Sequence, residues 1–584
     1  MKTIIKRREL PDSLPQLEDV SPLLQRIYAA RQIKNTQQLD YSFSQLLPFD
    51  QLKGMDAAVQ ILSAALVAQK RVLVVGDFDC DGATSTALAL KGLRAFGFKQ
   101  VEYLVPNRFE YGYGLTPEIV EVALEYQPDL IITVDNGISS IDGVARAKAQ
   151  GLQVVVTDHH LAGSQLPLAD AIVNPNQPGD NFASKNLAGV GVMFYVLMAL
   201  RAHLRKQDWF EKNNIKEPRL AQWLDLVAMG TVADVVVLDH NNRIMVSQGL
   251  ARMRAGQLCV GLKAMATVAG RPLQNLSASD LGFAIGPRIN AAGRLDDMSL
   301  GIECLLTTDA QTAQALAQQL DQLNRERRLI EDEMKQQALD LLAHMRLNDD
   351  DKNLPVGLCL FEAQWHEGVV GILASRIKER LHRPVIAFAR TANNQLKGSA
   401  RSVKGVHIRD VLDAVATRYP HLLSRFGGHA MAAGLSLMEE HYEPFAQAFD
   451  EEIRRHLDAD CLQGLIESDG ELCADEQSME MAELLGRAGP WGQGFEEPLF
   501  DGCFRLLQSR IVGEKHLKMR LANEDGRAID AIAFNTTDSQ WPENVERVRV
   551  AYRLDINEFR GERTLQLTIQ HLVPETNAEN VVEA

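Results

Sequence analysis

Residues 154–160 read Val-Val-Val-Thr-Asp-His-His, a β-branched run that ends in one carboxylate and two imidazoles. Two earlier apolar runs, residues 72–75 and 131–134, also lead into carboxylates. Stretches with helical periodicity separate these runs, which is the pattern of βαβ units. Parallel strands bring their carboxyl ends to one edge of a sheet, where open α/β folds bind their ligands. The sequence therefore predicts an α/β domain whose parallel sheet gathers acids and imidazoles at one edge.

The residues that follow these runs are typical ligands of divalent cations. In chain order they are Asp77, Asp79, Asp81, Asp135, Asp158, His159 and His160. Carboxylates this close together repel one another unless protons or a cation neutralise them, and oxygen and imidazole ligands suit manganese or magnesium. The Asp-x-Asp-x-Asp-Gly order also opens an EF-hand loop, but Leu88 stands where that loop needs glutamate, so we exclude it. We predict a metal-dependent hydrolase.

Several of these positions also allow a simpler structural interpretation. Asp135 precedes Asn-Gly, a common turn pair, so it could serve a turn as well as a metal. One histidine of the pair could pack while the other faces water. Asp234 lies among apolar residues, where an unpaired carboxylate is costly, and it is either a helix cap or a cation ligand. We favour the ligand, and Asp225 is a weaker candidate of the same kind.

The composition is that of a soluble globular protein with several domains. With 584 residues the chain is too long for one core, and 46% of its residues are hydrophobic and 24% charged. The net charge of −16 argues against a protein that coats nucleic acid with its whole surface, but it leaves room for a basic channel. The seven cysteines lack CxxC spacing, and no secretion signal or membrane span is evident. We expect a cytoplasmic protein with reduced thiols.

Changes of pattern along the chain divide it into six segments. Residues 311–346 lack Gly and Pro and predict one long, largely polar helix between two α/β patterns. Alternating apolar runs with turn signals near the C-terminus predict a small antiparallel barrel of the OB type. The segments are a helical preface (1–50), a first α/β domain (51–310), the connecting helix (311–350), a second, smaller α/β domain (351–464), the barrel domain (465–574) and a disordered tail (575–584).

Taken together and in this order, the motifs resemble the DHH phosphoesterase superfamily. Its members carry Asp-x-Asp, a strand-end Asp, Asp-His-His and a late Asp, which correspond here to residues 77–81, 135, 158–160 and 234. Residues 425–434 look like the glycine-rich signature of the associated DHHA1 domain. The stretches that narrow the resemblance to bacterial exonucleases acting on single-stranded DNA from 5′ to 3′ are 107–114, 287–294, 365–371, 398–402 and the predicted barrel. The resemblance covers roughly residues 50–570.

The resemblance implies two-metal hydrolysis of phosphodiester bonds. The implied ligands of two manganese or magnesium ions are Asp79, Asp81, Asp135, His159 and Asp234. Asp77 is implied as a further ligand or as a neighbour that holds water. His160 is expected to donate to the scissile phosphate, and Asp158 to orient an imidazole.

The resemblance also implies a clamp for the 5′-terminal phosphate of the strand. The residues expected to contribute are Arg108, Arg288, Arg294, Ser399, Arg401 and His429. Any single arginine is more often an ordinary surface residue, but we expect each of these in a loop rich in Gly, Ser or Asn, and a guanidinium matches the geometry of phosphate. The glycines beside His429 would let backbone approach the first nucleotides. The barrel would hold the strand further along by stacking.

Two other functions remain open on the sequence alone. One is a superfamily phosphodiesterase of short oligonucleotides, which has no use for a C-terminal barrel. The other is a non-catalytic, DNA-binding replication scaffold, against which the intact ligand set speaks. The family role implies single-stranded DNA as substrate, a helicase and a single-strand DNA-binding protein as partners, a place in DNA recombination and repair, no membrane contact, and a monomer.

Overall fold

The computed structural model describes residues 3–107, 111, 114–348, 355–391, 394–456, 464–513, 515–534, 536, 545–559 and 561–575. The chain forms two units. We call Ile5–Asp321 with Glu467–Ala584 the large unit, and Met1–Ile4 with Gln322–Ile466 the small unit. No helix within the described residues is both long and apolar enough to span a bilayer.

The large unit contains the predicted parallel sheet. Its strands are β2 (Val72–Val75), β3 (Val101–Leu104), β4 (Leu130–Val134), β5 (Gln153–Thr157) and β6 (Ala171–Val173), in the order β3-β2-β4-β5-β6. Every neighbouring pair in this sheet is parallel. The chain runs outward from β2 to β3 and then returns to β4 on the other side, so the strand order reverses between β2 and β4. Such a switch point is where doubly wound sheets bind ligands.

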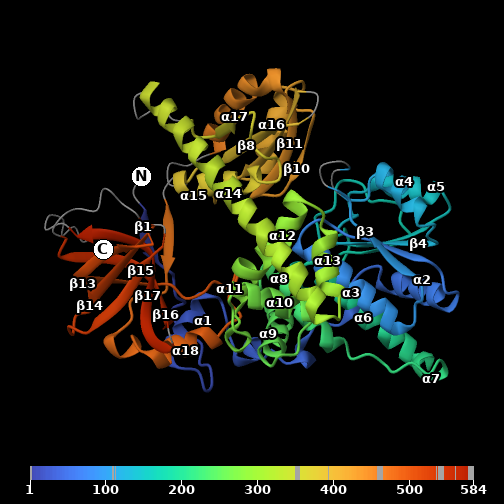
Figure 1. The fold of residues 1–584 in the computed structure, drawn as a ribbon, viewed down its shortest axis with the longest axis horizontal. Helices are drawn as coiled ribbons and strands as arrows, with labels where there is room; N and C mark the ends of the chain where they lie inside the picture. The colour runs from blue at the N-terminus through green and yellow to red at the C-terminus, as the bar shows by residue number, and fades with distance from the viewer. Residues whose placement is uncertain are drawn as a thin grey trace. The chain divides into compact units, whose positions relative to one another are not determined.

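Helices cover both faces of this sheet, which explains why its strands read as continuous apolar runs. Every residue of β2 and β4 is buried. Helices α4 (Pro117–Glu125) and α5 (Ile141–Ala149) pack on one face, and α3 (Cys80–Phe96) and α6 (Gly189–Lys206) lie on the other (Figure 1). Further helices follow the sheet: α8 (Leu224–Ala233), α9 (His240–Arg254), α10 (Val260–Val268), α12 (Gly286–Leu295) and α13 (Ser299–Leu306).

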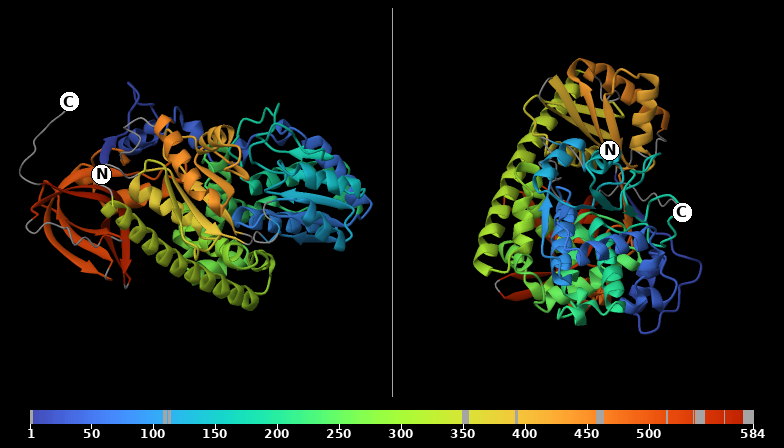
Figure 2. Two further views of the ribbon diagram at one scale, coloured as in Figure 1. Left: turned by 90° about the horizontal axis from the view of Figure 1, so that it is seen from above. Right: turned by 90° about the vertical axis from the view of Figure 1, so that its right-hand side faces the viewer.

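The predicted connecting helix is α14 (Ala310–Asn348), 39 residues long and unbroken (Figure 2). Its buried positions recur every three or four residues, which is the period of one helix face. The first of them are apolar, such as Ala313 and Ala317, whereas Asn324, Arg327 and Glu331 are polar. Arg327 bonds Asn324 and pairs with Glu331 one turn later. Arg327 therefore finds both of these partners within the helix itself.

The small unit holds a mixed sheet in the order β10-β11-β9-β8-β7. The elements are β7 (Leu358–Phe361), α15 (Val370–Leu381), β8 (Val385–Arg390), β9 (Gln395–Arg401), α16 (Ile408–Arg418), β10 (Arg425–Gly428), β11 (Ala432–Met438) and α17 (Tyr442–His456). The expectation that residues 398–402 form a loop was wrong, because Gly398 to Arg401 lie within β9. The strand was not predicted because it contains small residues where a strand usually has β-branched ones. Gly398 is required by its neighbour, since a Cβ there would lie 2.5 Å from the Phe388 ring.

The predicted barrel is present and closed. Its strands are β13 (Phe500–Val512), β14 (His516–Ala522), β15 (Ala528–Ala533), β16 (Arg547–Phe559) and β17 (Glu562–Glu575), in the order β13-β14-β15-β17-β16. One pair, β15 with β17, is parallel, so the expectation of a wholly antiparallel barrel was wrong at this pair. Residues 465–499 contribute β12 (Leu465–Ser468) and α18 (Met479–Arg487) ahead of the barrel. Residues 576–584 of the predicted tail lie outside the described residues.

The N-terminal preface is less helical than predicted. It contains the strand β1 (Ile4–Arg7), which pairs with β12, a single α-helix α1 (Pro22–Ala30) and three short 3-10 turns. Prolines at positions 11, 15 and 48 are consistent with this, since proline disrupts a helix interior. The preface is joined to the segment before the barrel by an ion pair between Arg31 and Asp469, whose atoms lie 2.7 and 3.0 Å apart in a two-pronged contact. Both side chains are 1% exposed.

Asp469→Ala should therefore destabilise the large unit strongly. Removing one partner leaves a buried guanidinium without its counter-charge, which costs about 3–5 kcal/mol of unfolding free energy. Glu9→Ala is the matched control, because the Glu9 pair with Lys6 is exposed and should contribute no more than about 1 kcal/mol. Denaturant unfolding followed by circular dichroism measures both. Equal, small effects would show that the Arg31 pair does not hold the preface in place.

Candidate metal centre

The acidic residues after β2 stand at the start of a helix. The Asp79 carboxylate caps α3 and accepts a hydrogen bond from the Gly82 N–H at 3.0 Å. Asp81 lies in the first turn of α3 and is almost fully buried. Its two oxygens accept from the N–H groups of Gly189 and Val190 at 2.6 and 2.9 Å. These N–H groups form the amino end of α6, which favours negative charge.

Two glycines leave room for the carboxylates of Asp135 and Asp81. A Cβ on Gly189 would lie 2.6 Å from the Asp135 side chain, and a Cβ on Gly230 would lie 2.7 Å from an Asp81 oxygen. Asp135 itself has a φ of +62°, a left-handed conformation that is strained for an aspartate. Its N–H donates to the Thr157 carbonyl at 3.1 Å, which ties the end of β4 to the end of β5. Neither glycine was singled out by the sequence analysis, since no motif marks either of them.

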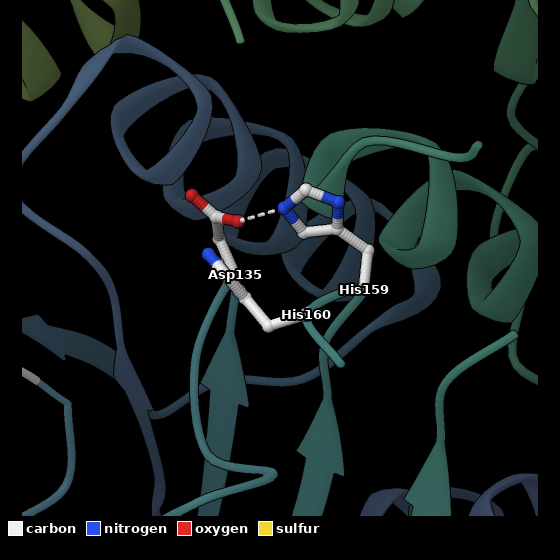
Figure 3. A group of neighbouring side chains, drawn as sticks. All are labelled: Asp135, His159 and His160. Carbon is white, nitrogen blue, oxygen red and sulfur yellow. Dashed lines mark ion pairs between the residues drawn. The ribbon is translucent and has the colours of Figure 1, made fainter. Parts of the chain in front are cut away.

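The imidazole of His159 links the strand ends to α8. Its Nε2 atom lies 3.1 Å from a carboxylate oxygen of Asp135 (Figure 3) and 3.5 Å from one of Asp234, which caps the end of α8. Three overlapping groups of side chains each bring their ligand atoms within 4.8 Å of one another. They are Asp81 with His159 and Asp234, Asp135 with His159 and His160, and Asp77 with Asp79 and Asp135. The structure thus brings together every residue predicted to bind metal.

Asp158 fixes the geometry of the two histidines. One of its oxygens accepts from the N–H groups of His159 and His160 at 2.7 and 3.1 Å and lies 2.8 Å from His160 Nδ1. The other oxygen accepts from the Ile138 N–H at 2.8 Å. Burial raises the pKa of Asp158, but the hydrogen bond and charge of His160 outweigh it and lower the pKa to about 2. Burial lowers the pKa of His160, and Asp158 in turn raises it to about 9.

Two asparagines that the sequence analysis missed hold the same segment by its backbone. The Asn176 amide donates to the His159 carbonyl at 2.6 Å, and the Asn174 amide donates to the His160 carbonyl at 3.0 Å. Both asparagines follow β6, so the neighbouring strand also supports the histidines. Asparagine after a strand is common in turns, and nothing in the sequence distinguishes these two from turn residues.

The charge balance of the centre suits cations. Burial, together with the nearby carboxylates, raises the pKa of Asp81 to about 7 and the pKa values of Asp135 and Asp234 well above the usual range. Several buried acids that resist ionisation are stabilised as anions when positive charge lies among them. Carboxylate oxygens and one or two imidazoles are ligands that manganese and magnesium accept. The residues present therefore fit divalent cations.

Asp225, the weaker candidate, has a structural role. One of its oxygens accepts from the Cys259 N–H at 2.6 Å, at the amino end of α10. Burial raises its pKa. None of the three ligand groups found among the described residues includes Asp225.

The arginines predicted in the large unit lie on a helix rather than in a loop. Arg288 and Arg294 belong to α12, where Pro287 is tolerated because it occupies the first turn. The Arg288 guanidinium is buried and contacts an Asp321 oxygen through Nε at 2.9 Å and Nη2 at 2.8 Å. Arg294 is half-buried in the last turn of α12. Arg108 lies outside the described residues.

The remaining predicted substrate residues belong to the small unit. Arg401 lies on β9 and donates to the hydroxyls of Ser399 and Ser375 at 3.1 and 3.2 Å and to the Ala400 carbonyl at 2.8 Å. Burial lowers the pKa of this guanidinium, and within the described part of the chain no carboxylate forms an ion pair with it. His429 is exposed in the turn between β10 and β11, where its N–H donates to the Ala432 carbonyl at 2.7 Å.

Comparison with known proteins agrees with this architecture. The DHH family N-terminal domain matches residues 71–231, the DHHA1 domain matches residues 353–455, and the RecJ OB domain matches residues 468–571. The chain is 54% identical to the single-stranded-DNA-specific exonuclease RecJ of Salmonella typhimurium, over 98% of this chain and 99% of that protein. It is 53% identical to the RecJ of Escherichia coli over the same shares.

A solved structure has the same fold. The crystal structure of RecJ in complex with Mn²⁺ from Thermus thermophilus is 32% identical, with a TM-score of 0.77 over 96% of this chain and 77% of that chain. A second structure of the same protein, in complex with Mg²⁺, has a TM-score of 0.72 at 30% identity and covers 96% of this chain and 76% of that chain. On the sequence, the three matched domains and the fold, this chain belongs to the RecJ family.

Proposed function

We propose that this chain is a nuclease that degrades single-stranded DNA from the 5′ end to mononucleotides by hydrolysis of phosphodiester bonds. The observation that carries the proposal is the convergence of Asp81, Asp135, Asp234 and His159 at the switch point of the sheet. The name single-stranded-DNA-specific exonuclease, borne by relatives at more than half identity, supports the substrate. The crystal structures of the Thermus thermophilus relative in complex with Mn²⁺ and with Mg²⁺ support the cofactor.

In this proposal Asp79, Asp81, Asp135, His159 and Asp234 hold two manganese or magnesium ions, with Asp77 as a ligand or a neighbour that holds water. Such ions, when bound, activate a water molecule and stabilise charge on the phosphoryl oxygens. Asp158 binds Nδ1 of His160 and so leaves the other ring nitrogen to donate to the scissile phosphate. Because Asp158 also accepts from two backbone N–H groups of the histidine segment, it orients the imidazole rigidly.

Arg401 is the best-supported ligand for the 5′-terminal phosphate. It is a half-buried cation held by hydroxyls, so an anion would supply the charge that its surroundings lack. Arg288, by contrast, already pairs with Asp321. Ser399 is the companion of Arg401, and the predicted contributions of Arg108, Arg288, Arg294 and His429 remain proposals.

The barrel domain is proposed to bind the strand further along. On the β13–β14 ladder Arg510 stands opposite Lys518, and Gln508 stands opposite Arg520. Like charges directly opposite each other destabilise a sheet, and a nucleic acid backbone would relieve that repulsion. Of the three cations Arg510, Lys518 and Arg520, only Lys518 forms an ion pair within the described part of the chain, at 3.2 Å from Asp530. We assign residues 51–310 to catalysis, 351–464 to substrate binding and 465–574 to strand binding.

The cellular setting is inferred from family membership. We propose a cytoplasmic monomer that acts in DNA recombination and repair with a helicase and a single-strand DNA-binding protein. A non-catalytic scaffold is disfavoured because the ligand set is complete. A phosphodiesterase limited to short oligonucleotides is disfavoured because the closed barrel would have no use.

His159→Ala should lower nuclease activity by about a thousandfold or more, since loss of the metal chemistry removes several kcal/mol of transition-state stabilisation. His203→Ala, which changes a half-buried histidine in the last turn of α6, is the control and should retain wild-type activity. The assay follows end-labelled single-stranded DNA with added manganese. Near wild-type rates for His159→Ala in chelator-washed protein would contradict the ligand assignment.

Arg401→Ala should discriminate between the two kinds of 5′ end. Loss of one charge-assisted contact is worth roughly 1.5–3 kcal/mol, so kcat/KM for 5′-phosphorylated DNA should fall about tenfold to a hundredfold, and for a 5′ hydroxyl much less. Arg401→Lys should recover part of the loss, because a point charge lacks the guanidinium fork. Arg454→Ala, an exposed cation of the same unit, is the control. If the ratio of the two kcat/KM values matches wild type, Arg401 does not read the 5′ phosphate.

Replacing Arg510, Lys518 and Arg520 together by alanine should weaken binding to long single strands. Each lost phosphate contact should also reduce the salt dependence of the affinity by about 0.7 logarithmic units per decade of salt. Arg563→Ala, which removes a barrel cation that pairs with Glu483, is the control. Fluorescence anisotropy at several salt concentrations gives both quantities. A binding curve and a salt slope equal to those of wild type would place the strand on another surface.

A further inference from the structure

The loop that follows the proposed ligand Asp234 is held in an unfavourable backbone conformation. We call residues 234–239 the Asp234 loop. Val235 has a φ of +64° and is 63% exposed. A β-branched residue in the left-handed region is costly and persists only where the surroundings fix it. The side chain of Val235 is too exposed to supply that constraint, so it must come from contacts that other residues of the loop make.

The constraint comes from a distant part of the chain. The Leu238 N–H donates to the Gln493 carbonyl at 2.8 Å, and the Leu238 carbonyl accepts from Arg243 Nη1 at 2.9 Å. The Val237 carbonyl accepts from the Asn242 amide at 2.9 Å. Gln493 belongs to residues 489–496, which we call the linker turn and which precede the first barrel strand. The loop is therefore bonded on one side by α9 and on the other by the linker turn.

Two glycines of the linker turn are in direct contact with the loop. A Cβ on Gly492 would lie 2.6 Å from the tip of the Leu238 side chain. A Cβ on Gly494 would lie 2.6 Å from Cγ1 of Val237, and Gly494 also has a φ of +71°. When one of two closely packed residues shifts, the other must shift too, because no empty space is left between them. The position of the linker turn thus limits the positions open to the Asp234 loop.

The preface holds the linker turn from its other side. The Tyr28, Trp491 and Phe495 rings form a cluster, with Trp491 and Phe495 stacked at a centroid distance of 5.0 Å. Arg31 Nε donates to the Glu496 carbonyl at 2.7 Å. The Arg243 guanidinium lies 4.2 Å above the Phe495 ring, so the residue that bonds Leu238 also packs on the turn. All of these residues belong to the large unit.

We propose that the linker turn is a positioning element of the metal centre: it fixes the Asp234 loop and thereby the place of the Asp234 carboxylate. Gly492, Gln493 and Gly494 are positioning residues, and the preface acts through them by keeping the turn rigid. The inference rests on the proposed role of Asp234 as a metal ligand. It gives the preface a role in holding the metal centre, and it places the linker turn with the catalytic site rather than with the barrel.

The test is the affinity of the full-length, chelator-washed protein for Mn²⁺, measured by isothermal titration calorimetry. Gly494→Ala should weaken Mn²⁺ binding about tenfold or more, in the range seen when groups that orient metal ligands are changed. Adding Val237→Ala to this variant removes the contacted methyl groups and should restore most of the affinity. Gly526→Ala is the matched control, because Gly526 also has a positive φ, +81°, but no atom lies within 4 Å of its Cβ position. It should bind Mn²⁺ like wild type.

Three outcomes would overturn the proposal: an unchanged isotherm for Gly494→Ala, an equal loss in Gly526→Ala, or no recovery in the double variant. Should Gly494→Ala fail to fold, Gly492→Ala takes its place, because its Cβ would meet only the side chain of Leu238 and no backbone atom. Leu238→Ala is then the rescuing change, and the same criteria apply. Asp234→Asn separates the two hypotheses. If it leaves Mn²⁺ binding intact, the ligand role fails. If it weakens binding while the glycine variant does not, the positioning role alone fails.

Discussion

Mutual repulsion among buried carboxylates is the constraint on which the rest of the large unit depends. Asp81, Asp135 and Asp234 come from three different elements, yet burial and their own proximity oppose ionisation of all three. A fold keeps such a cluster by surrounding it with donors and by accepting protons or cations. The amino end of α6 provides donors to Asp81, and Asp135 joins the cluster with its backbone in the left-handed region.

The supports of the cluster extend well beyond its ligands. Asp158 orients His160, two asparagines after β6 hold the histidine backbone, and glycines at positions 189 and 230 leave room for the carboxylates. The linker turn adds a support that is remote in sequence, since it fixes the loop after Asp234. A metal centre of this kind is therefore a property of the whole large unit, including the preface and the segment that leads into the barrel.

Local patterns predicted much of this architecture, because periodicity and strand-end acids are local signals. The runs 72–75, 131–134 and 154–157 predicted three strands of the sheet. The resemblance to a family implied a set of ligands, and the structure places these side chains close together. Tertiary contacts account for what was missed. The strand β9 was not predicted because it contains small residues, Gly398 and Ala400, that pack against large neighbours. The helix that carries Arg288 and Arg294 was not predicted because its sequence contains Gly and Asn, which are typical of loops. The role of the preface depends on its contacts with residues 469 and 489–496, which no local pattern indicates.

The central claim is that the carboxylates and His159 form one centre for two cations. Its most direct test is titration of chelator-washed, full-length protein with Mn²⁺, in which electron paramagnetic resonance counts the free ions and hence the bound ones. The account predicts two bound Mn²⁺ ions per chain in the wild type, and weakened binding of at least one of them in Asp135→Asn, because this residue belongs to two of the three ligand groups. Absence of bound Mn²⁺ in the wild type, or an isotherm that Asp135→Asn leaves unchanged, would contradict it.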